Sequence, residues 1–234
     1  MSRLLVASGL AGSLVLPVSA QDPTKTLPES YQVQLDNDHV RVVRVHYDAG
    51  AKLPEHTHPP GTTVYVYLND SDGVVFRHVG NSTRAVTRPP VRAGGVRVAS
   101  GGEEHHTAEN PASTPSDFLR VWFKTDNGGE RNLRRRLSPT DDTFENKQMR
   151  ITRLNVTADK SISVDTAQEP ALLVSLPSGD TRWIDRGQQV PLTAGAFLRI
   201  DFLTKPGTPQ RGAPRRSARH PIEGVPYAGP PGTP

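Results

Sequence analysis

The chain of 234 residues has no cysteine, 6% aromatic residues, 20 glycines and 22 prolines. The absence of cysteine excludes disulfides and thiolate metal ligands, and the many turn-forming residues favour short strands over a helical bundle. The net charge of +4 does not indicate nucleic-acid binding, because residues 205–234 contain five basic residues and one acidic residue and so account for the whole excess.

The first twenty residues resemble a secretory signal peptide. Arg3 is followed by an apolar run from Leu4 to Val18, and small residues surround Ala20. The run is shorter than the roughly 20 apolar residues that a membrane span requires. We therefore expect cleavage near Ala20, no transmembrane span in the mature chain, and a periplasmic or secreted protein.

The segment from residue 21 to 126 predicts a series of short strands. Val40–Tyr47 and Asp117–Lys124 are rich in β-branched and aromatic residues, and the turn sequence Asn69–Gly73 separates two further strands. Strands at this spacing are typical of a sandwich or barrel. At the other end of the chain, residues 205–234 contain eight prolines and are predicted to be a disordered Pro/Arg-rich tail.

Residues 127–148 are polar and charged, and they predict a linker with one helical turn at residues 131–137. Beyond it, residues 149–204 repeat earlier patterns. Met149–Val156 is similar to Val40–Tyr47, and Ala196–Thr204 is similar to Asp117–Thr125. Two repeated patterns in the same order indicate an internal duplication. The second copy is about thirty residues shorter between these patterns and has no histidine, so it cannot repeat a histidine site.

Histidines concentrate in two places of the first copy. His56 and His58 are one residue apart, and on an extended strand both side chains point the same way. His105 and His106 follow a Gly-rich turn about fifty residues later. Imidazole nitrogens from these two places can bind one metal ion, as in sites with three protein ligands.

These motifs resemble those of the cupin superfamily. The first family motif is Gly, five residues and His-x-His, and here Gly50 precedes His56 and His58. The second ends in His, three residues and Asn, which fits His106 and Asn110. The resemblance covers roughly residues 37–126. It implies an all-β fold: a cupin-type double-stranded β-helix or jelly-roll barrel at residues 21–126, followed by a shortened, degenerate cupin-like half at residues 149–204.

The sequence departs from the family pattern at two points. Thr62, or Thr63 under the alternative spacing, stands where the family places a metal-ligating Glu. The family's Pro-x-Gly-x-x-His spacing selects His105, whereas His-x-x-x-Asn selects His106, which we favour. Three histidines without the carboxylate still form a ligand set in some cupins, notably thiol dioxygenases. Nearby acidic residues are substitutes for the missing ligand: Glu55, Glu103 and Glu104.

The resemblance implies a divalent metal ion held by His56, His58 and His106, with iron favoured and Zn, Ni, Mn and Cu as alternatives. Thr62 and Tyr65 are candidates for substrate binding, and no catalytic residue is assigned. The expected partner is a small molecule, and exposed strand edges are compatible with a homodimer. An exported oxygenase acting on a small organic acid or phenolic compound is the favoured interpretation. A metal-dependent isomerase or lyase and a non-catalytic binding module are the alternatives.

Overall fold

The computed structural model describes residues 21–80, 84–125 and 129–203. The predicted signal peptide and the predicted Pro/Arg-rich tail lie outside these residues. The described part contains one short helix, α1 (Pro23–Thr26), and is otherwise built of strands, which confirms the all-β prediction. No helix among the described residues is long and apolar enough to cross a membrane.

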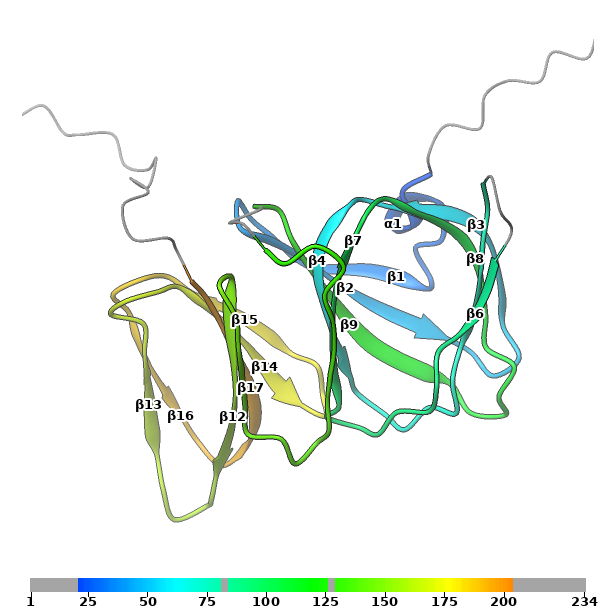
Figure 1. Cartoon of the computed structure of the whole chain (residues 1–234). Helices are drawn as coiled ribbons and strands as arrows, with labels where there is room; N and C mark the ends of the chain where they lie inside the picture. The colour runs from blue at the N-terminus through cyan, green and yellow to red at the C-terminus, as the bar shows by residue number, and fades with distance from the viewer. Residues whose placement is uncertain (1–20, 81–83, 126–128, 204–234) are drawn as a thin grey trace, which may run out of the picture.

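The first half consists of two antiparallel sheets that face each other (Figure 1). The larger sheet has the strand order β1-β2-β9-β4-β7-β10 and the smaller one has the order β3-β8-β5-β6. The strands of the larger sheet are β1 (Tyr31–Asp36), β2 (Val40–Tyr47), β4 (Gly61–Tyr67), β7 (Val96–Gly101), β9 (Ser116–Phe123) and β10 (Arg134–Leu137). Those of the smaller sheet are β3 (Lys52–His58), β5 (Val75–His78), β6 (Arg84–Thr87) and β8 (Glu104–Glu109).

The second half repeats the two-sheet plan with fewer strands. Its larger sheet has the order β11-β12-β17-β14-β15, and β13 pairs with β16 in a two-stranded sheet. The strands are β11 (Thr143–Glu145), β12 (Met149–Val156), β13 (Ile162–Asp165), β14 (Ala171–Leu176), β15 (Thr181–Ile184), β16 (Gln189–Leu192) and β17 (Gly195–Phe202).

The pairing of the central strands supports the predicted duplication. β2 pairs with β9 so that Val45 lies opposite Phe118, and β12 pairs with β17 so that Leu154 lies opposite Phe197. These are equivalent positions of the repeated sequence patterns. The turn before β2 is repeated before β12. The side-chain oxygen of Asn37 accepts hydrogen bonds from the backbone N–H groups two and three residues further on, and that of Asn146 does the same.

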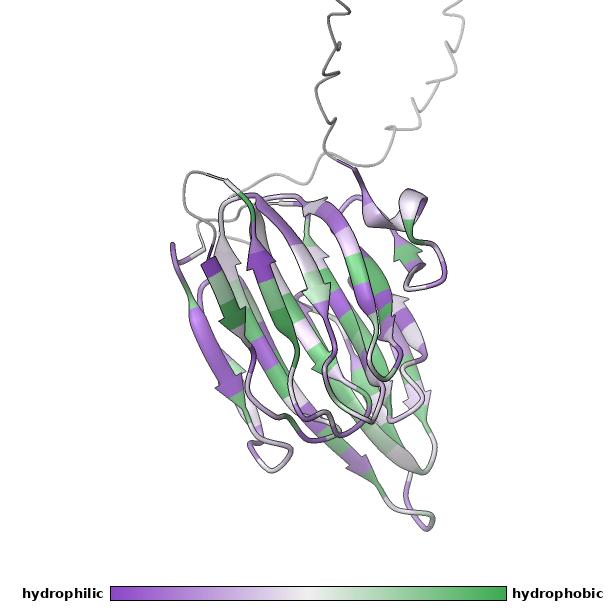
Figure 2. Cartoon of the chain, turned by 90° about the vertical axis from the view of Figure 1, so that its right-hand side faces the viewer, coloured by the Kyte–Doolittle hydropathy of each residue, from purple (hydrophilic) through white to green (hydrophobic). Residues whose placement is uncertain are grey.

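The larger sheet of the first half is buried on both faces. Side chains alternate across a strand, so Val43, Val45 and Tyr47 of β2 face the barrel interior while Val40 and Val42 face the other way. Figure 2 shows hydrophobic residues interspersed with hydrophilic ones along the strands. Because both faces are buried, β2 carries valine on each of them.

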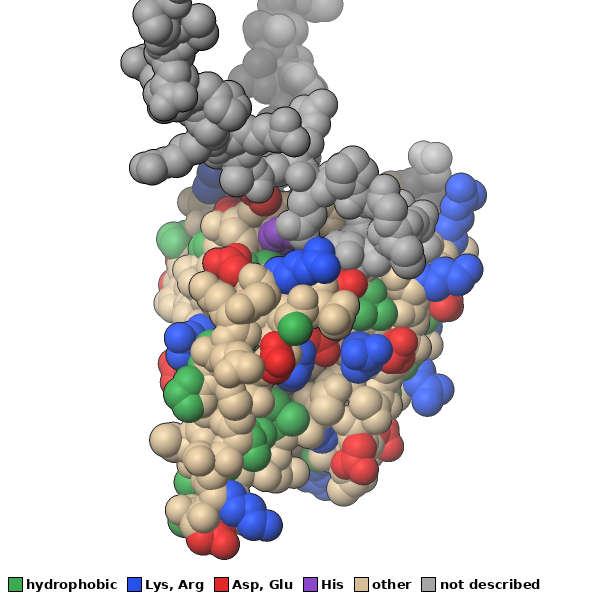
Figure 3. All heavy atoms as spheres, turned by 90° about the vertical axis from the view of Figure 1, so that its left-hand side faces the viewer, with side chains coloured by type: hydrophobic (Ala, Val, Ile, Leu, Met, Phe, Trp, Pro, Cys, Tyr) green, Lys and Arg blue, Asp and Glu red, His purple; other side chains and the backbone are tan. Residues whose placement is uncertain are grey.

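The outer face of this sheet packs against the larger sheet of the second half. One hydrophobic cluster contains buried residues of both halves, including Leu119 and Val121 from the first and Leu198 and Ile200 from the second. His39 stacks on Trp183 at the edge of this contact, with ring centroids 5.0 Å apart. The two halves therefore share one continuous core, and the exposed face of the second half carries interspersed acidic and basic side chains (Figure 3).

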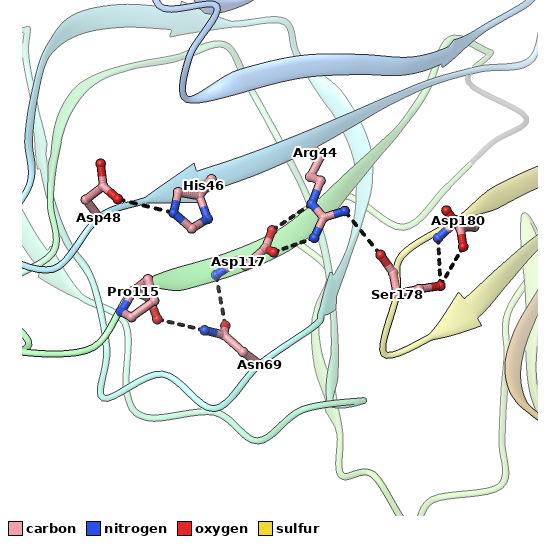
Figure 4. A network of polar contacts seen from close by, with 8 residues as sticks. All are labelled: Arg44, His46, Asp48, Asn69, Pro115, Asp117, Ser178 and Asp180. Atoms are coloured by element: carbon pink, nitrogen blue, oxygen red, sulfur yellow. Dashed lines mark hydrogen bonds and ion pairs between the residues drawn. The ribbon is translucent and has the colours of Figure 1, made fainter.

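A polar contact also joins the two halves (Figure 4). Arg44 holds Asp117 with two nitrogens, at 3.1 and 2.6 Å, and its third nitrogen donates to the backbone oxygen of Ser178 at 3.1 Å. Asp117 is positioned in turn by Asn69, whose side chain accepts from the Asp117 backbone N–H. The fork geometry of the guanidinium lets one side chain serve both halves.

The predicted linker, residues 127–148, contributes strands to both halves. The helical turn expected at residues 131–137 is wrong, because residues 134–137 form β10, which pairs with β7. The open edge of β7 offers backbone hydrogen bonds that an isolated helical turn cannot match, and Leu137 gains burial in the shared core.

The shared core predicts that the two halves unfold together. Each half contains one of the chain's two tryptophans, Trp122 in the first and Trp183 in the second. The fluorescence of a Trp183→Phe protein therefore reports on the first half, and that of a Trp122→Phe protein reports on the second. Leu198→Ala removes a fully buried side chain and is expected to destabilise the chain by about 2–5 kcal/mol. When Leu198→Ala is added to each single-tryptophan protein, the urea concentration at the midpoint of unfolding should fall by the same amount in both.

Val33→Ala serves as the control, because Val33 is exposed and such changes usually alter stability by less than about 0.5 kcal/mol. A Trp122 transition that stays unchanged in Leu198→Ala would show that the halves unfold independently.

Candidate metal centre

Two paired strands of the smaller sheet bring three histidines together. His56 and His58 lie on β3 and point to the same side because they are two residues apart. His106 on β8 lies directly opposite His56 in the antiparallel pair. One nitrogen from each ring lies within 4.8 Å of the others, and the three residues are 0%, 6% and 3% exposed.

His105, the alternative ligand, lies on the other face of β8. Its Nε2 is 2.5 Å from a carboxylate oxygen of Glu55, which also points away from the barrel interior. The sequence motifs left a choice between His105 and His106, and strand alternation places only His106 beside His56 and His58. Glu55 is thereby turned away from the three histidines.

The His56 ring is held in one tautomer by its neighbours. Nδ1 lies 2.8 Å from the backbone oxygen of Pro54, which can only accept, so Nδ1 carries the proton. Nε2 is therefore an acceptor, and the Tyr31 hydroxyl donates a hydrogen bond to it over an O–N distance of 2.8 Å. Tyr47 in turn donates to the Tyr31 oxygen at 2.6 Å. This tautomer leaves the Nε2 lone pair directed at the barrel interior.

Both ring nitrogens of His106 are buried and have no hydrogen-bond partner in the described part of the chain. Phe76 and His78 flank the ring, with centroids 4.9 and 5.4 Å away. A buried polar atom without a partner costs roughly 1–3 kcal/mol, so natural proteins rarely leave one without a reason. A metal ion between the three imidazoles would satisfy one of these nitrogens, and the donor set therefore fits a metal.

The surroundings keep all three imidazoles neutral. Burial lowers the pKa of His56, lowers that of His58 well below its ordinary value, and lowers that of His106 to about 2. The guanidinium of Arg120 lowers all three further. Neutral imidazole is the form that binds a metal, so the pocket supplies its ligands without a competing proton near neutral pH.

Thr62 does not face the barrel interior. Its hydroxyl donates at 2.8 Å to Gln148, beside the second half, because even-numbered residues of β4 point toward the shared core. The expectation that Thr62 binds a substrate in the barrel interior is corrected accordingly. Thr63 and Tyr65 lie on the opposite, inward face of β4 by strand alternation. A neutral hydroxyl at Thr63 thus stands where a lumen-facing carboxylate would be placed.

A small cavity of about 20 Å³ lies beside His58 and His106 inside the barrel. A wider vestibule of about 350 Å³ opens next to α1 and shares three residues with the cavity: Tyr31, His58 and Arg120. Tyr65 lines the inner cavity, as does Glu104, whereas Glu103 lines the vestibule. Asn110 takes no part, because its side-chain N–H groups donate to three backbone oxygens of the adjoining loops.

Several residues of this interior were not among the candidates predicted from the sequence: Tyr31, His78, Arg97 and Arg120. A usable signal was present for the two arginines. Each stands between apolar neighbours in a strand, in Val96-Arg97-Val98 and Leu119-Arg120-Val121. A charged residue at that position points to the face opposite the apolar core, and here that face is also enclosed. Tyr31 and His78 carried no comparable signal.

The buried histidines predict acid-sensitive stability in the metal-free protein. Below about pH 6.5 an unfolded histidine binds a proton, but folded His106 does not until its depressed pKa near 2 is reached. The unfolded state is therefore favoured as pH falls, by about 1.4 kcal/mol per pH unit for each such group. The urea-derived stability should fall between pH 6 and pH 4 by less in His106→Gln than in the parent.

The difference should correspond to about one proton bound on unfolding. His46→Gln, at a position where the side chain is 42% exposed, is the control for removing a histidine from the chain. Equal pH slopes for parent and His106→Gln would contradict a neutral, buried His106.

No protein-family model matches the sequence. No curated protein matches it either. Solved structures do match in fold. The glyoxylate-induced protein of Pseudomonas aeruginosa has a TM-score of 0.53 at 12% identity, covering 78% of this chain and 82% of its own. A cupin domain from Bordetella pertussis Tohama I has 21% identity and a TM-score of 0.35, covering 41% and 92%. The nickel(II) complex of the Escherichia coli pirin YhhW has 14% identity and a TM-score of 0.47, covering 75% and 91%.

At these identities the likeness concerns the fold. Two facing antiparallel sheets and the two histidine motifs on paired strands agree with it, and the predicted resemblance is confirmed at that level. The chain has the cupin fold, a double-stranded β-helix, followed by a shortened half of the same kind.

Proposed function

We propose that this chain is a metal-dependent cupin enzyme in which His56, His58 and His106 hold one divalent ion. Iron is the favoured ion, with Zn, Ni, Mn and Cu as alternatives. The observation that carries the proposal is the convergence of three buried, neutral imidazoles whose ligand nitrogens lie within 4.8 Å of one another. Neutral imidazole binds all of these metals, and the order of their affinities for such a site does not decide which one is bound in the cell.

Three protein ligands leave positions open for a substrate or water. A bound ion would supply Lewis acidity or, if it is iron, redox chemistry with oxygen. Because the family carboxylate is absent and Thr63 is neutral, the site keeps more positive charge than a site with three histidines and a glutamate. This charge favours substrates that are acidic or become anionic, and we propose oxygenation of a small organic acid or phenolic compound.

The chain's own groups would orient the substrate and exclude water. The Tyr31 hydroxyl donates a hydrogen bond to His56 Nε2 in the described form, so a metal bond at Nε2 would free that hydroxyl. Burial keeps the pKa of Tyr31 well above its ordinary value, so Tyr31 acts as a hydrogen-bond donor and not as a base. Tyr65 lines the inner cavity and is the substrate-binding candidate that we retain, and Phe76 and Phe118 supply apolar parts of the same lining.

A non-catalytic binding module is the second candidate. It is favoured by the small inner cavity, about 20 Å³, and by the Tyr31 hydroxyl that already engages His56. A module that holds a ligand for sensing or transport needs no open reaction position. An isomerase or lyase would use the same three histidines with a redox-inactive ion. Export to the periplasm or outside the cell, and assembly as a homodimer, remain predictions.

Metal content is the first test of the proposal. Plasma mass spectrometry should find near-stoichiometric metal in protein purified without chelator or metal-affinity tag. His56→Ala and His106→Ala should lose it, because each removes one of only three ligands. The loss should exceed the roughly 10- to 100-fold effect of removing an outer hydrogen-bond partner of a ligand. His105→Ala is the matched control and should retain the metal.

Absence of metal from the parent, even after reconstitution, would overturn the proposal and leave a binding module. Once metal binding is established, oxygen uptake distinguishes an oxygenase from an isomerase, a lyase or a binding module. Iron with oxygen consumption in the presence of a small acid or phenol would support the oxygenase, whereas tightly held Zn or Ni without consumption would support the isomerase, lyase or binding role.

A further inference from the structure

We infer that the barrel interior binds a small organic dianion, such as a short dicarboxylate, through the guanidinium groups of Arg97 and Arg120. As a ligand class for the same interior, this inference rests on the proposed function. Its basis is a set of buried arginines that the three-histidine site does not use.

Arg97 and Arg120 are enclosed almost completely, with 6% and 7% of their surfaces exposed. Arg97 Nη2 and Arg120 Nε are buried and have no hydrogen-bond partner within the described residues. Removing a charged group from water without a counter-charge is costly, so buried charges are normally paired. Two such groups in one barrel indicate that their partner is a ligand.

Both arginines point toward the histidines because side chains alternate between the two faces of a strand. Arg97 lies between Val96 and Val98 of β7, and these valines belong to the shared core. Arg120 on β9 has the same relation to Leu119 and Val121. Both arginines line the inner cavity together with His58 and His106. The positive charge of Arg120 lowers the pKa of all three histidines, which is consistent with its closeness to them.

The charges around the cavity favour a ligand with two negative charges. Arg88 is a third arginine in the lining, and its Nε is also buried without a hydrogen-bond partner in the part of the chain that the structure describes. Glu104 is the acidic residue of the lining. Three cations and one anion leave two positive charges uncompensated. Burial and the neighbouring Arg97 lower the pKa of Arg88, so the arginines repel one another.

Aromatic rings lie against the faces of two guanidiniums. Arg97 Cζ lies 4.7 Å from the Tyr65 ring centre, and Arg88 Cζ lies 5.5 Å from that of Phe76. Stacking fixes the guanidinium plane without using its N–H groups. These in-plane groups are the ones that bind a carboxylate with two parallel hydrogen bonds.

The route inward passes Arg120. The inner cavity, about 20 Å³, holds roughly one water molecule, whereas the vestibule is about 350 Å³. Arg120 lines both spaces, together with Tyr31 and His58. A short dicarboxylate can enter through the vestibule, meet Arg120 first, and extend toward Arg97 as the cavity widens around it.

Calorimetric titration of the full chain with malonate and succinate tests this inference. Acetate and neutral malonamide serve as comparison ligands, at constant ionic strength and in both metal-free and metal-loaded protein. The dianions should bind, with malonamide not binding and acetate much weaker. Arg97→Met and Arg120→Met should each weaken dianion binding by roughly 10- to 100-fold, the equivalent of a charge-assisted hydrogen bond. The exposed Arg135→Met is the matched control and should bind as the parent does.

Thermal unfolding distinguishes a ligand-binding arginine from a structural one. Without ligand, Arg120→Met should be as stable as the parent or more stable, because the change removes an unpaired buried charge. It should lose the dianion-induced rise in Tm. A lower Tm in Arg120→Met with the dianion-induced rise retained would overturn the inference. So would equal binding of malonamide, or no dianion binding in the parent.

His106→Gln separates this inference from the proposed function. Dianion binding that persists in metal-free parent and in His106→Gln supports the arginine site, even if no metal binds. Binding that requires metal, disappears in His106→Gln and is unchanged in both arginine variants would assign the dianion to the metal alone. That result would overturn the inference and leave the proposed function standing.

Discussion

The structure depends on one sheet, β1-β2-β9-β4-β7-β10, that is buried on both faces. Its outer face forms a common core with the second half, and its inner face closes the barrel. Because both sides are enclosed, alternate residues of the same strand enter two different environments. Apolar residues such as Val96 and Val98 hold the two halves together, while Arg97 between them enters the barrel interior. The second half thus contributes burial to the sheet that carries these arginines, although it has no histidine site of its own.

The smaller sheet supplies the chemistry that the larger sheet encloses. β3 and β8 place His56, His58 and His106 at adjacent positions, and burial keeps their imidazoles neutral. The opposite wall presents Arg97 and Arg120, whose buried Nη2 and Nε have no hydrogen-bond partner among the described residues. A neutral, metal-ready wall facing a cationic wall is suited to a small acid that contacts both. Fold alone does not establish such a role, because cupin-like barrels serve many functions.

The internal duplication explains why half of the molecule lacks a site. The strand pairs β2–β9 and β12–β17 keep the same pairing, and Asn37 and Asn146 form the same turn. These features belong to the sheet that forms the shared core, and so they are required in both copies. The strands that carry the histidines belong to the other sheet, which is reduced to β13 and β16 in the second copy. Packing between the halves constrains the strands of the larger sheet in each copy and not those of the smaller sheet.

The sequence by itself determined the all-β fold, the duplication and the two histidine segments, since each depends on local spacing that alternation converts into structure. Only the tertiary structure placed His106, and not His105, beside His56 and His58, because that choice depends on the pairing of β8 with β3. The same holds for Thr62, which occupies the position of the family's metal-ligating Glu but contacts Gln148 at the junction of the halves. Tyr31, Arg97 and Arg120 join the interior from strands far away in sequence. Long-range pairing decides which face of each strand is enclosed, and no local pattern contains that information.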